Sequence, residues 1–196
     1  MAETTRAQSP KKLPEVLTDA ERKKLLAQPN PKAPTGLRNL CMMHLMLNAG
    51  LRVAETLGLK NRDLDWMSGK LMVREGKGAK DRTLWLGEDD LELVRTWRER
   101  RPVQNELLFV TLQGGRLNDR YIRTMVKRLA QKAGIDKDVH PHTLRHTFAT
   151  DLYRDTKNIR LVQKALGHAD LSTTMIYTHI VDEELEEALK VFRRSA

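Results

Sequence analysis

Cysteine is almost absent from this chain of 196 residues, which contains only Cys41. A single cysteine excludes an intramolecular disulfide, and a lone cysteine with apolar neighbours is usually a small core residue of a protein in a reducing compartment. Long apolar runs are also absent. No segment approaches the length of a membrane span, and the N-terminal residues MAETTRAQSPKKLPE lack the apolar core of a signal peptide. These absences favour a cytoplasmic protein without a membrane partner.

Acidic residues are scarce relative to basic ones. Twenty-six Asp and Glu stand against 35 Lys and Arg, which gives a formal net charge of +9 and a pI near 9.8. This excess favours a polyanionic partner, because each neutralised phosphate releases condensed counterions. A protein with a merely basic surface would show the same balance, so the charge indicates a class of partner only. The length and the 40% hydrophobic content fit one domain with one core.

Sheet signals are confined to one place in the sequence. LMVRE and RTLWL, over 71–75 and 82–86, read as two strands joined by the Gly-containing loop GKGAKD. Elsewhere the apolar spacing predicts helices, which we expect over 18–26, 37–49, 88–101, 119–132, 142–153, 159–166 and 182–193. ELLFV, over 106–110, is a candidate extended piece. Residues 1–16 read as a flexible basic arm. The fold class is therefore mainly α with a small antiparallel β-hairpin, an α+β domain.

Basic residues follow the predicted helix after Asn118, which is a good N-cap. The helix carries Arg120, Arg123, Lys127 and Arg128, and these four charges could track a phosphate backbone. A solvated face of an amphipathic helix explains them equally well.

Candidate catalytic groups are concentrated between residues 142 and 179, HTLRHTFATDLYRDTKNIRLVQKALGHADLSTTMIYTH. Breaking a phosphodiester without a metal needs guanidinium groups to clamp its oxygens, a nucleophile and a general acid. This stretch and two upstream motifs contain suitable side chains, namely Arg52, Lys77, His142, Arg145, His168 and Tyr177. His142 and Arg145 are three residues apart and share one helix face. Each residue taken singly would be a surface or packing residue by default.

Metal and nucleotide sites are poorly supported by the same stretch. His142 and His146 are four apart, as in a zinc-binding helix, but the residues between them are Thr-Leu-Arg, with no acidic base and with a fixed positive charge. GKGAK lacks the spacing of a Walker-type phosphate loop. We therefore expect neither a metal nor another cofactor.

Four motifs occur in an order that resembles the catalytic domain of the tyrosine recombinases, in particular the Xer and integrase group. They are GLRVAETLGL, EGKGAKDR, HTLRHTFAT and LGHADLSTTMIYTH, and the resemblance extends from about Thr18 to the C-terminus. It implies that Tyr177 attacks the scissile phosphate to form a 3′-phosphotyrosyl bond. Arg52 and Arg145 would clamp the phosphate, and His142 and His168 would bind it and handle the nucleophile's proton.

The general acid and a supporting carboxylate are also implied by the resemblance. Lys77 in the hairpin loop would protonate the leaving 5′-oxygen, with Lys80 as the alternative, and Glu55 would support Arg52. A 5′-hydroxyl of a partner strand would then rejoin the DNA, without ATP or metal.

The resemblance further implies double-stranded DNA as the partner and self-association on DNA, as a tetramer on two paired sites. The predicted C-terminal helix 182–193, with Leu185 and Leu189 in its apolar stripe, is the candidate contact between protomers, and packing on its own domain is the alternative. Residues 17–196 would be the catalytic domain, with no separate N-terminal DNA-clamping domain, as in a single-domain member or a fragment.

Two other functions remain open: a non-catalytic DNA-binding recombination regulator, and a DNA-relaxing enzyme of the type IB topoisomerase kind.

Overall fold

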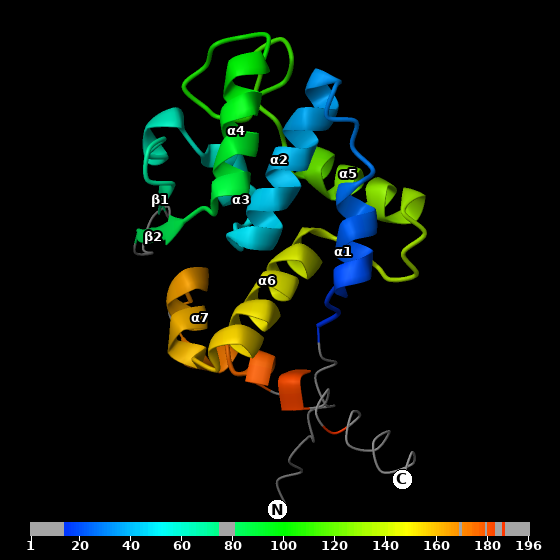
Figure 1. Cartoon of the computed structure of the whole chain (residues 1–196), viewed down its shortest axis with the longest axis vertical. Coiled ribbons are helices and arrows are strands. Elements are labelled where there is room, and N and C mark those ends of the chain that lie inside the picture. Colours follow the sequence, from blue (N-terminus) through cyan, green and yellow to red (C-terminus); the bar gives the residue numbers. More distant parts are fainter. Residues whose placement is uncertain (1–13, 75–80, 169, 179, 183–185, 187–196) are drawn as a thin grey trace, which may run out of the picture.

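Helices form wherever the sequence offers both a cap and an apolar face. The computed structural model describes residues 14–74, 81–168, 170–178, 180–182 and 186. Its helices are α1 (Asp19–Leu26), α2 (Pro34–Asn48), α3 (Val53–Gly58), α4 (Glu88–Arg100), α5 (Asp119–Lys132), α6 (Pro141–Thr156) and α7 (Ile159–Leu166), with short 3₁₀ turns η1 (Asn61–Asp63) and η2 (Leu171–Thr173). The two strands are β1 (Lys70–Val73) and β2 (Arg82–Trp85). The predicted class, mainly α with a small antiparallel hairpin, is confirmed (Figure 1).

Local capping explains why most predicted helix ends are right. Thr18 accepts a hydrogen bond from the backbone N–H of Glu21, whose carboxylate accepts one from the backbone N–H of Thr18, so the expected capping box opens α1. Asn118 and Asn158 cap α5 and α7 through their side chains. Gly167 ends α7 with φ 68°, a left-handed conformation that suits glycine.

Two helix ends and one expected extended piece differ from the prediction by more than one residue. The second helix begins at Pro34 rather than at 37, because proline fits the first turn, where its missing N–H would have no intrahelical partner. α6 continues to Thr156, three residues beyond its predicted end. The piece over 106–110 is no strand and forms only isolated bridges, Lys60 with Leu107 and Val110 with Arg116.

The main core lies around α2, which packs against α4 and α6. Leu45, Met42 and Met46 are fully buried there, together with Trp97 of α4. Cys41 is also buried, as the sequence predicted, and burial raises the pKa of its thiol. Within the described residues, no helix combines the length and apolar character needed to cross a membrane.

A second, smaller apolar cluster joins α6 to α7 and to the segment after it. Ala149, Val162, Leu166, Tyr177 and Ile180 form its buried centre. Figure 1 places α6 and α7 together at the lower end of the molecule, with the hairpin beside α7, and α7 and β2 are in contact. The residues that surround the candidate site therefore come from both clusters.

Candidate active site

Gly50 follows the end of α2 and turns the chain toward α3. Its φ of 62° is left-handed, and a Cβ at this position would lie 2.3 Å from Cδ1 of Phe148. Glycine is thus required twice, by conformation and by the close approach of α6. The carbonyl of Gly50 accepts a hydrogen bond from Nη1 of Arg145, so this turn is also one of the anchors of the site.

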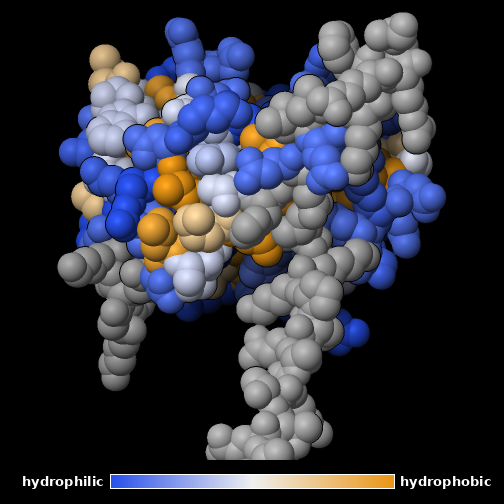
Figure 2. All heavy atoms as spheres, turned by 90° about the horizontal axis from the view of Figure 1, so that it is seen from below, coloured by the Kyte–Doolittle hydropathy of each residue, from blue (hydrophilic) through white to orange (hydrophobic). Residues whose placement is uncertain are grey.

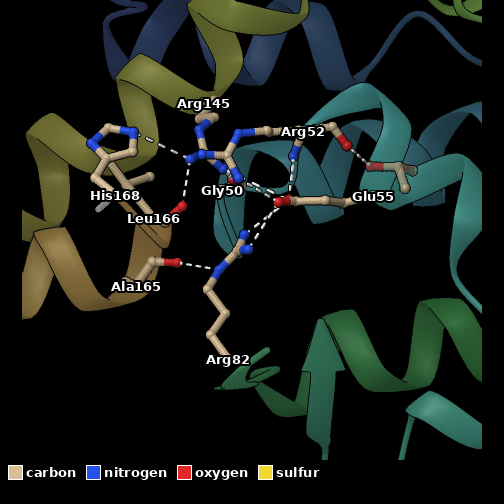
Figure 3. A network of polar contacts seen from close by, with 9 residues as sticks. Gly50, Arg52, Glu55, Arg82, Arg145, Ala165, Leu166 and His168 are labelled. Atoms are coloured by element: carbon tan, nitrogen blue, oxygen red, sulfur yellow. Dashed lines mark hydrogen bonds and ion pairs between the residues drawn. The ribbon is translucent and has the colours of Figure 1, made fainter. Parts of the chain in front are cut away.

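Arg145 is fixed on α6 by main-chain carbonyls from two other elements. Besides Gly50, its Nη2 donates to the carbonyl of Leu166 at the end of α7, over 2.6 Å. The same nitrogen lies 3.4 Å from Nε2 of His168 (Figure 3). Burial and the nearby Arg52 lower the pKa of Arg145 to about 10, so its guanidinium still carries a charge at neutral pH.

Glu55 is the carboxylate on which three arginines converge. Arg52 Nη1 lies 2.7 Å from its Oε1, Arg82 contacts both oxygens at 2.8 Å, and Arg145 Nη1 lies 3.8 Å from Oε2. Burial alone would raise the pKa of Glu55, but the hydrogen bonds and charge of Arg82, with the other donors, lower it to about 2. Glu55 is therefore an anion that holds Arg52 and Arg145 in one place.

Arg82 was not predicted from the sequence, although the hairpin strand that carries it was. Its side chain is only 5% exposed, and its Nε donates to the carbonyl of Ala165 in α7 over 2.8 Å. Arg82, at the start of β2, therefore contacts both α3, through Glu55, and α7, through Ala165 (Figure 3). A buried cation in a strand is unusual, and the residue type alone gives no sign of it.

The two predicted histidines differ in their surroundings. His168 is partly buried, with Nδ1 3.0 Å from Oγ1 of Thr174 and Nε2 toward Arg145. Burial, then the charges of Arg145 and Arg52, lower its pKa to about 4. His142, on the first turn of α6, is exposed over much of its surface, but partial burial of its ring, followed by the nearby His140 and Arg145, lowers its pKa as well.

Tyr177 lies on a helical turn after η2 and is 1% exposed. Its hydroxyl lies 2.9 Å from Nδ1 of His146, a residue that the sequence analysis considers only as half of a metal-binding pair with His142. Burial raises the pKa of Tyr177 to about 12, against the lowering effect of Arg145. His146, next to Arg145 on α6, is therefore a site residue that the sequence did not predict, since the contact spans 31 residues.

Five of the six predicted residues can be placed. Arg145, His168, Arg52 and Glu55 are linked by direct contacts, and Tyr177 joins them through His146 beside Arg145. His142 lies one turn before His146 on α6, with ring centroids 6.4 Å apart. Lys77 and its alternative Lys80 lie outside the described residues, as do Leu185 and Leu189. In the described part of the chain, no three His, Cys, Asp or Glu side chains are grouped so as to hold a metal ion.

Relatives of this chain are found among both sequences and structures. The tyrosine recombinase XerD of Ralstonia nicotianae is 40% identical over 185 residues, which cover 91% of this chain and 60% of the relative. XerC of Xanthomonas axonopodis pv. citri is 39% identical over 173 residues, covering 88% and 56%. The chain thus spans 56 to 60% of the length of these two relatives.

Solved structures give the same result. The XerA recombinase matches with a TM-score of 0.80 at 36% identity, over 94% of this chain and 67% of that one. The XerH site-specific recombinase, in a post-cleavage complex with a palindromic difH substrate, matches with a TM-score of 0.79 at 36% identity, over 93% and 54%. A model of the phage integrase family matches residues 15–184. The chain therefore belongs to the phage integrase family, and it is similar in sequence and fold to the Xer tyrosine recombinases.

Proposed function

We propose that this chain is a site-specific recombinase that cleaves and rejoins strands of double-stranded DNA through a 3′-phosphotyrosyl intermediate. The observation that carries the proposal is the convergence of Arg52 and Arg145 on one buried carboxylate, with His168 3.4 Å from Arg145. Two fixed guanidinium groups and a histidine suit the charge of a pentavalent phosphoryl transition state. We assign this chemistry to residues 17–196, and the proposed DNA substrate favours a cytoplasmic location.

The proposed reaction exchanges one phosphoester for another. Oη of Tyr177 attacks the scissile phosphorus, the bond from phosphorus to the 5′-oxygen breaks, and the leaving oxygen takes a proton from Lys77, the general acid that the family resemblance implies. Arg52 and Arg145 bind the nonbridging oxygens, and His142 and His168 donate further hydrogen bonds. Rejoining is the reverse attack, in which a 5′-hydroxyl displaces Tyr177 from phosphorus. It needs no added energy source, because the phosphotyrosyl ester replaces the phosphodiester that was broken.

Tyr177 must become more accessible before it attacks. With 1% of its surface exposed, its hydroxyl cannot reach a phosphorus atom unless covering side chains move aside. We propose that DNA binding causes this movement, because an entering phosphate offers Arg145 and His168 an anionic partner.

The DNA surface is proposed to include α5. Arg120, Arg123, Lys127 and Arg128 are all exposed along this helix, as the sequence suggested. A hollow of about 380 Å³ between α5 and the start of α6 is lined by Arg123, Lys127, His140 and His142, among others. It connects the basic helix to His142, so a DNA backbone that follows α5 would arrive at the proposed catalytic groups.

Self-association on DNA, as a tetramer on two paired sites, is proposed to involve the end of the molecule that carries α7. Figure 2 views the molecule from this end and shows apolar side chains among the polar ones. Leu161 and Met175 are 42% and 40% exposed, next to the partly buried Ile159 and Ile176. The C-terminal helix predicted over 182–193, supplied by a second copy of the chain, is the occupant that we propose for this surface.

Covalent capture tests the proposed chemistry. Protein is incubated with nicked duplex fragments of the source genome and denatured, and DNA that migrates with protein is collected and sequenced. We expect adducts with the wild type and none with Tyr177→Phe, which should still bind DNA. Tyr153→Phe is the matched control, since Tyr153 packs in the same apolar cluster. Adducts with Tyr177→Phe, or none with the wild type while DNA is bound, would contradict the proposal.

A further inference from the structure

The hydroxyl of Tyr177 and the imidazole of His146 form a pair inside the site. Oη lies 2.9 Å from Nδ1, and the two rings are tilted by 48° with centroids 5.8 Å apart. Because Tyr177 is 1% exposed, its hydroxyl has been removed from bulk water. Nδ1 of His146, rather than bulk water, is therefore the hydrogen-bond partner of the phenol before DNA enters the site.

The other histidines of the site are engaged elsewhere. His168 has Nδ1 at 3.0 Å from Thr174 and Nε2 at 3.4 Å from Arg145, so both of its ring nitrogens have partners other than the phenol. His142 lies beyond His146 on α6, with ring centroids 6.4 Å apart, and is exposed toward the hollow beside α5. His146 is the histidine at hydrogen-bond distance from the nucleophile within the described residues.

We infer that His146 is a catalytic residue that accepts the proton of Tyr177 during strand cleavage and returns it during rejoining. This assignment rests on the proposed function. In the forward step the Oη–H bond breaks and its proton passes to Nδ1 of His146, while Oη bonds to phosphorus. The bond from phosphorus to the 5′-oxygen breaks, and that oxygen is protonated by a separate acid. The roles of base and acid thus fall on different residues.

The electrostatic setting leaves His146 ready to accept a proton. Burial, followed by the nearby His142, Arg145 and His140, lowers the pKa of His146 to about 4, so its ring is neutral at pH 7. The groups that face His146 are His142 and Arg145 on α6, His140 at the N-cap of that helix, and Tyr177 and His168 from the segment after α7.

A bound phosphate changes this balance. Its negative charge favours the protonated ring, so the pKa of His146 rises when DNA enters the site. The pKa of Tyr177, about 12 without DNA, falls when its oxygen bonds to phosphorus. The two pKa values therefore approach each other as the reaction proceeds, which is what an efficient proton transfer requires.

A histidine that only positions the phenol would behave differently from one that takes its proton. Gln at position 146 can still accept a hydrogen bond through its amide oxygen, but it cannot be protonated near neutral pH. Rescue by Gln would therefore indicate positioning, whereas rescue by added imidazole would indicate proton transfer.

The test uses the whole chain and a duplex that the wild type has been shown to attack covalently. Single-turnover cleavage is measured from pH 6 to pH 9 for the wild type, His146→Ala and His146→Gln. We expect both variants to bind the duplex normally and to cleave it about 100-fold more slowly. Their rates should rise with pH more steeply than the wild-type rate, because hydroxide must then remove the phenolic proton. Imidazole should restore His146→Ala by at least roughly tenfold and leave His146→Gln unchanged.

A second substrate distinguishes a defect in the general base from a defect in the general acid. When sulfur replaces the bridging 5′-oxygen, the leaving thiolate needs no proton, so a defect in the general acid is relieved and a defect in the base is not. We expect the His146 variants to remain slow on this duplex.

Thr150→Val is the matched control on α6, one turn after His146, because Thr150 is buried and its hydroxyl has no hydrogen-bond partner in the described structure. Its cleavage rate should match the wild type.

Each result has a definite meaning. Wild-type rates in His146→Ala, full activity in His146→Gln, or rescue of either variant by the sulfur substrate would overturn the assignment of His146 and leave the proposed function intact. Absence of any Tyr177-dependent adduct in the wild type would instead overturn the proposed function, and this inference with it.

Discussion

Arg82 and Glu55 form a two-point ion pair, with Nη1 and Nη2 of the arginine each 2.8 Å from a different carboxylate oxygen. Both side chains are nearly buried, at 5% and 6% exposure. The pair connects β2 to α3, and the same Glu55 holds Arg52 and faces Arg145. The geometry of the proposed phosphate clamp therefore depends on a residue that touches neither DNA nor the nucleophile in our scheme.

Replacing Arg82 by alanine should destabilise the protein and disturb the clamp together. Removing one partner of a buried ion pair costs about 3–5 kcal/mol, because the remaining charge stays buried. Arg82→Lys should lose less, since an ammonium can bind one of the two oxygens. Urea unfolding gives the free energies, and covalent capture gives the cleavage rates. Arg62→Ala is the control, because Arg62 is 66% exposed and should change stability by less than about 1 kcal/mol. Equal effects of Arg82→Ala and Arg62→Ala would contradict this reading.

Gly50→Ala should be costly for two reasons that can be separated. Its φ of 62° disfavours a side chain by about 1–2 kcal/mol, and the new Cβ would lie 2.3 Å from Phe148, which adds about 1–3 kcal/mol. Phe148→Leu in the Gly50→Ala background should recover part of the steric cost and none of the conformational cost. Thermal or urea unfolding measures both changes.

Gly58 provides the matched control for Gly50. It ends α3, and a Cβ there would meet nothing within 4 Å, so Gly58→Ala should be neutral or slightly stabilising. Because the carbonyl of Gly50 binds Arg145, we also expect Gly50→Ala to slow cleavage more than Gly58→Ala does. Indistinguishable stabilities for the two variants would show that the turn tolerates a side chain.

DNA binding by α5 should appear in the salt dependence of the affinity. Arg123→Gln and Lys127→Gln should each weaken binding and lower the slope of log K against log salt by about 1, as expected for one lost phosphate contact. Arg100→Gln, at the C-terminal end of α4, is the charge-matched control and should leave the slope unchanged. Fluorescence anisotropy of a labelled duplex at several salt concentrations measures these slopes. Unchanged slopes for the α5 variants would place the DNA elsewhere.

The sequence predicts this fold best where a structure is determined locally. Thr18 with Glu21, Asn118 and Asn158 satisfy backbone N–H groups within three residues, so their helix starts can be read directly. Gly167 ends α7 for an equally local reason. The motifs around Arg52 and Arg145 were found by resemblance to a family, and the structure supplies the contacts that join them.

Contacts between distant elements could not be predicted in this way. Arg82 and Glu55 are 27 residues apart, and His146 and Tyr177 are 31 apart. A strand alternates its side chains between two faces, but only the packing of α3 and α7 against the hairpin decides that Arg82 points inward. His146 looked like half of a metal pair with His142 because spacing on one helix was the only geometry available. Tyr177 reaches His146 only because the segment after η2 packs against α6, and this tertiary contact cannot be read from spacing along one helix.

The lowered pKa of His168 predicts how stability changes with pH. Burial and the charges of Arg145 and Arg52 hold this pKa at about 4 in the folded protein, whereas an unfolded histidine has an ordinary value near 6.5. Between these two values the unfolded chain binds more protons than the folded one. The free energy of unfolding therefore falls as the pH falls from about 6.5 toward 4, and it is independent of this group above that window.

Substitution of His168 should remove part of this pH dependence. Asn at position 168 keeps a polar group near Thr174 but takes up no proton, so His168→Asn should lose less stability than the wild type between pH 7.5 and pH 5. The difference should be on the order of 1 kcal/mol, after allowance for partial exposure of the ring. Urea unfolding at the two pH values measures it. A parallel loss in both proteins would mean that His168 titrates normally in the folded state, and that neither burial nor Arg145 and Arg52 keep it neutral. A duplex bound at the site should reverse the effect, because a phosphate beside His168 stabilises the protonated ring and raises its pKa.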